Sequence, residues 1–346
     1  MNKLTITVTG GTGYIASWIV SDLLREGHRV RITVRDKSNK EKYQHLLDIE
    51  NKTDGSLDIY EADLLALGSF DKAIAGAEYV MHTASPFFLD DGGDAQKNLV
   101  DPAVKGTQNV LDSVHRSGTV KRVVLTSSVA AIYGDSRELK EQGISALDET
   151  MWNQSSSLSR NAYSYSKTEA EKAAWEIVKK QDQWELVTIN PGFVLGPSLT
   201  KRIDSTSIST LLRILRGEIK SGAPDLGFVF SDVRDISRGH ILAAFTPEAK
   251  GRYIIAHESG NLLTLAKIIE ASKPGQYKVP RGLVPKWLLW LLAPSLGFSR
   301  QFVRDNVGFS VSVDNSKSLR DLKMEYTPLE KTVMDQVEQL KKDQLI

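Results

Sequence analysis

The segment VTGGTGYIAS, residues 8–17, joins an apolar β-branched run to a helical pattern and decides the fold. Gly10, Gly13 and Ala16 are spaced so that a strand can turn tightly, its backbone can approach a ligand, and a helix can pack closely against it. The amino end of that helix would face the charge of a phosphate. The segment therefore predicts a dinucleotide-binding turn, the alternative being an ordinary strand–helix connection.

An alternation of strands and helices continues from this turn to about residue 190. Short apolar runs are separated by amphipathic helical stretches. Strands that are apolar on both faces indicate a parallel sheet covered by helices on both sides. We therefore predict an α/β fold with a doubly wound parallel sheet of the Rossmann type. Its predicted strands are 4–9, 29–34, 57–62, 78–84, 120–128 and 184–190.

The regular alternation ends after "PGFVLGP", residues 191–197. Helical segments, turns and isolated strand-like pieces such as 252–256 follow without a fixed order. We predict a dinucleotide-binding domain at 1–192 and a smaller, mixed substrate-binding region at 193–346. This second region is expected to be partly interleaved with the sheet, around residues 226–257.

The composition limits the possible classes of function. The chain has 346 residues and a formal charge of +1, and its basic residues are spread along it, so we expect no nucleic-acid partner. It contains no cysteine, which excludes disulfides, thiol catalysis and cysteine-ligated metals. Its six histidines show no metal-ligand spacing, so we predict no metal site.

Neither the amino terminus nor the most apolar late segment predicts insertion into a membrane. The amino terminus lacks the pattern of a secretory signal. The most apolar late segment, 284–297, is bounded by Pro285 and Pro294 and is shorter than the ~20 apolar residues that cross a bilayer. We interpret it as a buried helix with Pro285 in its first turn, contact with a membrane surface being the less favoured alternative. A cytoplasmic protein without a membrane partner is expected.

The end of the second predicted strand, "TVRD" at 33–36, bears on the choice of cofactor. An acidic residue here would bind the ribose 2′-hydroxyl of NAD, whereas an arginine suits the 2′-phosphate of NADP. Arg35 lies at this position and Lys42 follows on the next helix. Asp36 could instead present its carboxylate to a hydroxyl. The pattern favours NADPH over NADH.

The third and fourth predicted strands end in "EADLLALGSF" (61–70) and "MHTASP" (81–86). Ligands of open parallel sheets bind beyond the carboxyl ends of the strands. Asp63 is therefore placed to accept a hydrogen bond from an adenine amine. The small residues Thr83, Ala84 and Ser85 would let a cofactor lie against the backbone.

A pair of tyrosines precedes a strongly helical run in "NAYSYSKTEAEKAAWE", 161–176. Tyr163 and Lys167 are four residues apart and share one helix face, whereas Tyr165 has Glu169 at the same offset. A nearby cation favours the phenolate, so Lys167 is expected to lower the pKa of Tyr163. This makes Tyr163 the candidate acid.

A third polar group is expected beside this pair. Ser127 and Ser128, in "TSSVAAIYG" at 126–134, follow the fifth predicted strand. A serine there could donate a hydrogen bond to an oxygen that gains charge during reaction. The residues together predict reduction of a carbonyl group: nicotinamide supplies the hydride and Tyr163 supplies the proton.

These motifs, in this order, resemble the extended short-chain dehydrogenase/reductase family, particularly its dihydroflavonol reductase-like carbonyl and aldehyde reductases. The resemblance covers nearly the whole chain and includes "DPAVKGTQNVL", "NPGFVLGP" and "DVRDISRGH". It implies a catalytic triad of Ser128, Tyr163 and Lys167, and it selects Ser128 over Ser127. It also implies NADPH or NADP⁺ as cofactor. The predicted cofactor-binding residues are Gly10, Thr12, Gly13, Tyr14, Ile15, Arg35, Lys42, Asp63, Leu64, Thr83, Ala84, Ser85, Tyr163, Lys167, Pro191, Gly192 and Val194.

The substrate is expected to be a small aldehyde or ketone, apolar or aromatic. Phe87, Phe88, Phe193 and Trp287 suggest such a pocket, although each residue taken singly is more typical of a core. The loop 86–98 and the segment 198–232, which are expected to line the pocket, do not follow the plant flavonoid pattern closely, so no flavonoid is predicted. The oligomeric state is predicted as monomer or homodimer.

Other functions fit the same fold. A nucleotide-sugar epimerase would need cations for a diphosphate, which Lys201, Arg202, Arg213 and Arg216 could supply. A hydroxysteroid-type dehydrogenase of the same fold is a further alternative. A non-catalytic NADP-sensing protein would have no need to keep serine, tyrosine and lysine together, so their joint presence favours an enzyme.

Overall fold

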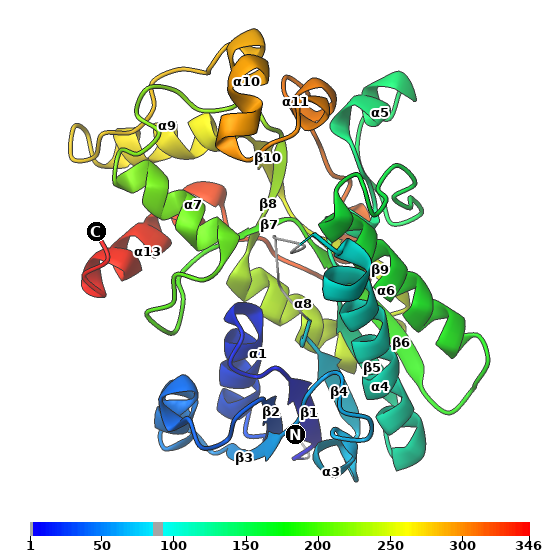
Figure 1. Ribbon diagram of the computed structural model, residues 1–346. Helices are drawn as coiled ribbons and strands as arrows, with labels where there is room; N and C mark the ends of the chain where they lie inside the picture. The colour runs from blue at the N-terminus through cyan, green and yellow to red at the C-terminus, as the bar shows by residue number, and fades with distance from the viewer. Residues whose placement is uncertain (1–2, 86–92) are drawn as a thin grey trace.

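The computed structural model describes residues 3–85 and 93–346, and its centre is a seven-stranded sheet (Figure 1). Every neighbouring pair of strands in this sheet is parallel. The strand order reverses between β1 and β4, which creates the crevice where ligands of such sheets bind. The predicted Rossmann-type sheet is thereby confirmed. In spatial order its strands are β3 (Ser56–Glu61), β2 (Arg29–Val34), β1 (Thr5–Thr9), β4 (Tyr79–His82), β5 (Arg122–Thr126), β6 (Glu185–Pro191) and β9 (Gly251–Ile255).

The central strands are buried on both faces, as their sequences require. In β1, Ile6 and Val8 point into one core, while Thr7 lies on the opposite face and donates a hydrogen bond of 2.7 Å to the carbonyl of Ala73. A threonine can occupy this interior because its hydroxyl is satisfied. Burial on both faces explains why these strands lack a polar alternation.

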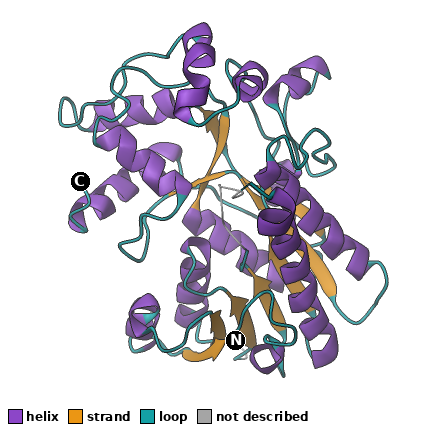
Figure 2. Ribbon diagram, in the orientation of Figure 1, coloured by secondary structure: helices purple, strands orange, loops and turns teal. Residues whose placement is uncertain are grey.

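Helices cover both faces of the sheet (Figure 2). Helix α1 packs against α2 and α8 on one face, and α4 packs against α3 and α6 on the other. The long helix α4 ends at Gly118, whose φ of +63° is the left-handed conformation that glycine adopts readily. These helices are α1 (Tyr14–Arg25), α2 (Gln44–Glu50), α8 (Val233–Phe245), α3 (Asp71–Ile74), α4 (Asp101–Ser117) and α6 (Ala162–Val178).

A second lobe has its own three-stranded sheet and its own core. Strand β8 (Phe228–Asp232) pairs in parallel with β7 (Phe193–Leu195) and antiparallel with β10 (Glu258–Gly260). Helices α7 (Thr206–Leu215), α9 (Leu262–Ser272) and α13 (Leu329–Lys342) bury their apolar faces around it. The remaining elements are η1 (Lys40–Lys42), η2 (Gln96–Val100), η3 (Val129–Ala131), α5 (Ser136–Glu141), α10 (Lys286–Leu292), η4 (Ala293–Leu296), α11 (Arg300–Asn306) and α12 (Ser316–Asp321).

One strand reaches the main sheet from the later part of the chain. The segment 252–256, which we grouped with the mixed region, forms most of β9 and pairs with β6. The order of the elements thus brings residues from beyond β7 and β8 back to the dinucleotide-binding sheet. The boundary at residue 192 stays a prediction.

The prediction of a buried helix at 284–297 is wrong. Helix α10 has no buried residue, and the side chain of Trp287 is 69% exposed. Only one side of this two-turn helix finds apolar neighbours, because Leu289 packs against Val303 and Val307 while the other face meets solvent. No helix within 3–85 or 93–346 is long and apolar enough to span a bilayer.

Candidate functional site

The first βα turn packs its glycines tightly against neighbouring chain. Gly10 has a φ of +64°, and a Cβ atom there would lie 3.1 Å from the Cα of Ala84. A Cβ on Gly11 would lie 2.5 Å from Ile32, and a Cβ on Gly13 would lie 3.2 Å from the carbonyl oxygen of Gly10. Because side chains are kept out, a pyrophosphate can come close to this backbone. The N–H groups of Gly10, Gly11 and Gly13 donate within the protein to Thr33 and Gly10, so the N–H groups left for a phosphate are those that follow at the start of α1. These residues fit a dinucleotide cofactor.

The first turn of α1 supports the same fit. Gly13 is its N-cap, and no side chain within the described chain caps the helix, so backbone N–H groups of the first turn can bind an anion. The hydroxyl of Tyr14 donates to the carbonyl of Gly196, and Ile15 packs on the core of the sheet. Tyr14 therefore fastens the turn to the second lobe through its side chain.

The two predicted 2′-phosphate residues lie beyond the end of β2. Arg35 and Lys42 are both exposed. Asp36 accepts hydrogen bonds from the N–H of Ser38 at 2.9 Å and from its hydroxyl at 2.6 Å, and these bonds hold the pKa of the Asp36 carboxyl below its usual value. Because this carboxylate is turned onto its own loop, Arg35 is the better candidate for contact with a cofactor.

Arg202 adds a further cation beside the glycine turn. Its guanidinium donates to the carbonyl of Thr12 at 3.3 Å and pairs with Asp204 at 2.8 Å. It also acts on the neighbouring helix α2: burial, followed by the charge of Arg202, lowers the pKa of His45 to about 4. From the sequence, Arg202 was a candidate cation for the diphosphate of a nucleotide sugar, whereas in the structure it lies beside the predicted dinucleotide turn.

The predicted adenine-side residues form a compact turn after β3. Asp63 is exposed and its carboxylate accepts a hydrogen bond of 2.8 Å from the N–H of Leu65. Leu64 packs against Gly106, where an added Cβ would lie 3.0 Å from that of Leu64. Asn109 of α4 donates to the Leu64 carbonyl at 3.0 Å and so holds the turn in place.

The residues after β4 connect the glycine turn with the predicted catalytic helix. The hydroxyl of Thr83 donates to the carbonyl of Thr9, and the N–H of Ala84 donates to the Thr9 hydroxyl at 3.1 Å. Ser85 accepts a hydrogen bond of 2.8 Å from the Nζ of Lys167. The structure thus brings the end of β4 next to α6, although 82 residues separate Ser85 from Lys167.

Tyr163 and Lys167 lie on one face of the first turns of α6. The Nζ of Lys167 is 5.8 Å from the centre of the Tyr163 ring. Helix α6 starts after Asn161, whose φ of +56° turns the chain into the helix. Glu169, which lies four residues after the alternative Tyr165, pairs with Lys172 at 3.2 Å.

The expected effect of Lys167 on the phenol is wrong for the protein chain alone. Burial raises the pKa of Tyr163 to about 12, and burial lowers the pKa of Lys167 to about 8. Removal from water disfavours the charged form of each group, and at this separation the ammonium does not outweigh that cost. Tyr163 therefore holds its proton at neutral pH.

The two neighbouring serines differ in their surroundings. Ser127 is buried and donates its hydroxyl hydrogen to the carboxylate of Glu171. Ser128 is only half-buried; its oxygen accepts a hydrogen bond of 3.1 Å from the N–H of Ala130, and its carbonyl accepts one of 3.1 Å from Asn190. An accepted bond leaves the Ser128 hydroxyl hydrogen available, so this geometry favours Ser128 as a donor to substrate.

Sequence reasoning missed the buried Glu171 below these serines. Its carboxylate also accepts from Asn190 at 2.9 Å and from the guanidinium of Arg252 at 2.7 Å. A buried carboxylate with this many donors is a fixed anchor. The available signal was its position four residues after Lys167 on the same helix; its partner Arg252 is 81 residues further along.

The predicted nicotinamide-side residues follow β6. Pro191 is buried, and the N–H of Gly192 donates to the Ser231 hydroxyl at 2.9 Å. A Cβ on Gly192 would lie 2.1 Å from the carbonyl oxygen of Val229, so only glycine fits here. Val194 is half-buried against the core of the sheet.

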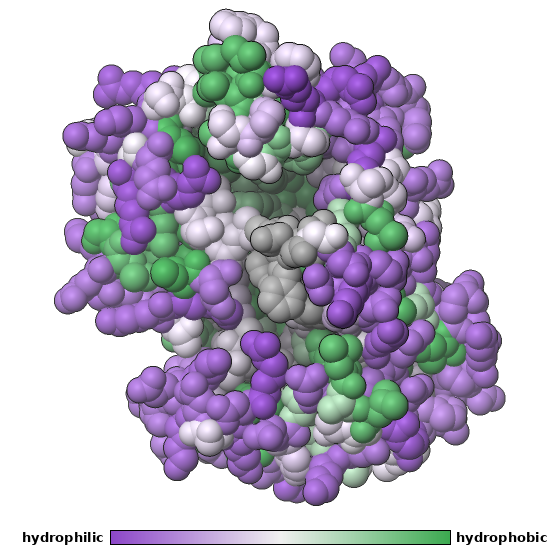
Figure 3. Space-filling model, in the orientation of Figure 1, coloured by the Kyte–Doolittle hydropathy of each residue, from purple (hydrophilic) through white to green (hydrophobic). Residues whose placement is uncertain are grey.

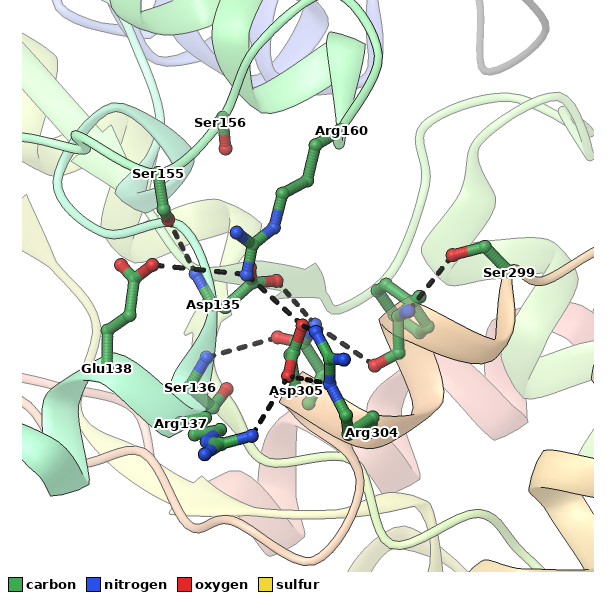
Figure 4. Close-up of polar contacts among 12 residues, drawn as sticks. Asp135, Ser136, Arg137, Glu138, Ser155, Ser156, Arg160, Ser299, Arg304 and Asp305 are labelled. Atoms are coloured by element: carbon green, nitrogen blue, oxygen red, sulfur yellow. Dashed lines mark hydrogen bonds and ion pairs between the residues drawn. The ribbon is translucent and has the colours of Figure 1, made fainter.

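An ionic cluster anchors the chain just before Tyr163 (Figure 4). Arg160 pairs with Asp135 and, at 3.2 Å, with Asp305 of α11. Asp305 also pairs with Arg304 at 2.8 Å, which is the main reason that the pKa of its carboxyl is below its usual value. The cluster joins the approach to α6, the start of α5 and helix α11.

The candidate diphosphate cations and the candidate pocket aromatics do not come together in the structure. Arg213 pairs with Glu218 at 3.3 Å and Arg216 donates to the carbonyl of Leu345 at 3.0 Å, so neither joins Arg202 in a diphosphate site. Of the proposed pocket aromatics, Phe193 packs 4.8 Å from Phe228 between ring centres, and Trp287 is exposed on α10. Phe87, Phe88 and most of the loop 86–98 lie outside the described residues.

A glycine turn at the switch point of a seven-stranded parallel sheet, with serine, tyrosine and lysine near the same strand ends, defines an extended short-chain dehydrogenase/reductase. Comparison with known proteins makes this specific. The model of the NAD dependent epimerase/dehydratase family matches residues 6–256, and the chain belongs to that family.

Its relatives and structural neighbours include several reductases. Cinnamoyl-CoA reductase CAD2 of Medicago truncatula is 34% identical over 97% of this chain and 95% of its own length. An anthocyanidin reductase of Vitis vinifera is 36% identical over 81% of this chain and 84% of its own length. The crystal structure of Gre2 from Candida albicans in complex with NADPH is 30% identical, covers 98% of this chain and 99% of that chain, and has a TM-score of 0.77. The predicted resemblance to the dihydroflavonol reductase-like reductases is confirmed.

Proposed function

We propose that this protein reduces an aldehyde or ketone to the alcohol with NADPH as the reductant. The observation that carries the proposal is the bond from Lys167 to Ser85, because it brings the Tyr163 helix to the strand end that also touches the glycine turn through Ala84. NADPH, when bound, supplies a hydride. The chain's own residues would hold it and provide the proton.

The protonation states suit the direction of reduction. With a pKa of about 12, Tyr163 is a neutral phenol at physiological pH and can donate its proton to an oxygen that is becoming an alkoxide. Ser128 would donate a hydrogen bond to the same oxygen, which stabilises the charge as it develops. Lys167 would hold the cofactor ribose and, while charged, favour the phenolate that remains after proton transfer.

The residues proposed to hold the cofactor divide by chemistry. The turn from Gly10 to Gly13 and the first turn of α1 would take the pyrophosphate. Arg35 and Lys42 would take the 2′-phosphate, since guanidinium and ammonium groups pair with phosphate. Arg202 would add positive charge from the second lobe. The NADPH bound in the Candida albicans neighbour supports this choice of cofactor.

The substitution Tyr163→Phe tests the function. It removes one hydroxyl and keeps the ring, so NADPH affinity should remain within about two-fold while aldehyde-dependent NADPH oxidation falls by about 10²–10⁴. Tyr165→Phe is the matched control and should keep turnover. Turnover of both variants and of the wild type is measured with a panel of aldehydes, α-diketones, keto esters and aryl ketones, with NADPH and NADH in parallel. Full turnover in Tyr163→Phe, or no turnover of any carbonyl by the wild type, would reject the proposal.

A further inference from the structure

A contiguous apolar surface covers the outside of α10 and η4. The α10–η4 surface consists of Trp287, Trp290, Leu291, Leu292 and Leu296, each more than 40% exposed. Figure 3 shows the apolar residues gathered over α10 at the top of this face. Large apolar side chains grouped in this way usually mark a contact with another body.

The inner side of α10 holds the helix against the rest of the protein. Leu289 packs on Val303 and Val307, and the Nζ of Lys286 donates to the carbonyls of Arg304 at 2.8 Å and Val307 at 2.6 Å. The helix is therefore fixed in place by α11, and its outer residues are presented on a rigid support.

The charge around the surface points to an anionic partner. Residues 271–304 include six basic residues and no acidic residue, whereas the whole chain has a net charge of only +1. Lys273 pairs with Glu338 and Arg304 pairs with Asp305. The other four have no ion pair within the described part of the chain; they are Lys278, Arg281, Lys286 and Arg300.

One of these cations adjoins the α10–η4 surface directly, and another is close to it in the sequence. The Arg300 guanidinium lies 4.5 Å from the centre of the Trp290 ring. Arg281 precedes the exposed Leu283 by two residues at the start of the same segment. Exposed tryptophan and leucine bordered by arginine and lysine is the composition of protein surfaces that lie in the headgroup region of a bilayer.

We propose that the α10–η4 surface docks on the surface of an anionic phospholipid bilayer. Tryptophan and leucine enter the boundary between headgroups and acyl chains, and the arginines contact lipid phosphates. A second copy of this chain fits less well, because a symmetric contact would bring the same unpaired cations together. Docking through this surface inserts side chains only and does not depend on the proposed reductase activity.

Sedimentation of the full chain with vesicles tests the proposal. At low salt, we expect binding to vesicles of phosphatidylcholine with about a third phosphatidylglycerol, and at least about five-fold weaker binding to phosphatidylcholine alone. The double variant Arg281→Gln, Arg300→Gln should bind the anionic vesicles about 20-fold more weakly. Raising NaCl from about 0.05 M to about 0.5 M should weaken wild-type binding.

A matched pair of variants tests the apolar contribution. Trp287→Ser should lose most of the binding, whereas Leu67→Ser, which removes an exposed side chain after β3, should bind like the wild type. Circular dichroism establishes that each variant is folded. Absence of vesicle binding, equal binding to neutral and anionic vesicles, or equal loss in Trp287→Ser and Leu67→Ser would overturn the proposal. So would a dimer that Trp287→Ser dissociates and that binds no vesicles.

Discussion

The two ends of the candidate cofactor site are built differently. At the chemistry end, Ser128, Tyr163 and Lys167 are at least half-buried and sit on hydrogen-bonded supports. At the phosphate end, the side chains of Arg35 and Lys42 extend into solvent. Chemistry requires fixed positions to a fraction of an ångström, whereas attraction of a phosphate requires mainly charge. If these residues have the proposed roles, the protein fixes the proposed reacting groups before the cofactor arrives and leaves the phosphate contacts to form on binding.

The largest expected effect separates the two serines of the chemistry end. Ser128→Ala should lower kcat by about 10²–10³, because a donor to the developing alkoxide is lost. Ser127→Ala should lower kcat only a few-fold but destabilise the fold by about 1–3 kcal/mol, because Glu171 loses a donor in the interior. Steady-state kinetics and urea unfolding of both variants provide the measurement. Equal loss of kcat in the two variants would contradict the assignment of Ser128 as the donor to substrate and of Ser127 as a structural residue.

A second prediction compares buried histidines at the two ends. Burial is the main reason that the pKa of His82, at the end of β4, is lowered to about 3, while that of His45, near Lys42, is lowered to about 4. In the unfolded chain these two histidines bind protons below about pH 6.5, whereas in the folded chain they stay neutral well below that pH. Their contribution to the free energy of unfolding is therefore fully present above about pH 6.5 and is lost as pH falls.

Because of His82, we expect the free energy of unfolding to be about 2 kcal/mol lower at about pH 5 than at about pH 7.5. His45, with a pKa of about 4 in the folded chain, is also neutral there at about pH 5, so its contribution at that pH should be of similar size. Urea unfolding at the two pH values, in the wild type and in His82→Asn and His45→Asn, measures each part. A wild type that is more stable at the lower pH would contradict the sign.

The phosphate end gives the next smaller effect. Arg35→Gln should weaken NADPH binding about ten-fold and leave NADH binding unchanged, because only the 2′-phosphate distinguishes the two cofactors. Arg213→Gln, which removes a cation that pairs with Glu218 instead, is the control. Fluorescence titration with both cofactors gives the ratio. Parallel losses for NADPH and NADH would move Arg35 away from the 2′-phosphate.

The smallest effect concerns Lys167. Since its pKa is lowered to about 8 by burial, the side chain loses its charge as pH rises through that value. NADPH affinity should therefore decrease a few-fold between about pH 7 and about pH 9, because a neutral amine is a weaker donor to the ribose. The same titration of Lys167→Arg should show no such decrease. A flat profile for the wild type would place the lysine outside the cofactor contacts.

Much of the fold could be predicted because its signals are local. The glycine turn and the apolar strands that follow it each occupy fewer than ten neighbouring residues, and they place the parallel sheet. The partner of β9 could not be predicted in this way, since its pairing with β6 joins residues about sixty positions apart. Helix α10 misled the prediction because apolar composition alone does not say whether a neighbouring element exists to cover it.

The candidate site shows the same division. The spacing of Tyr163 and Lys167 on one helix is local and the structure keeps both residues together. The direction of the Tyr163 pKa depends on burial by several distant segments, so the sequence led to the wrong sign. The choice between Ser127 and Ser128 rests on Glu171, whose carboxylate is held by distant partners, Asn190 at the end of β6 and Arg252 of β9.

The position of Arg252 also constrains the order in which the protein can be assembled during synthesis. Its guanidinium pairs with Glu171 and donates to the carbonyl of Glu149 at 3.1 Å, so it completes a polar interior whose other members precede residue 192. A ribosome that has delivered only the first half of the chain leaves the Glu171 carboxylate without its cation and the edge of β6 unpaired. The sheet of the nascent chain therefore lacks its last strand until β9 emerges. A truncated protein that ends between the two lobes would keep the edge of β6 exposed.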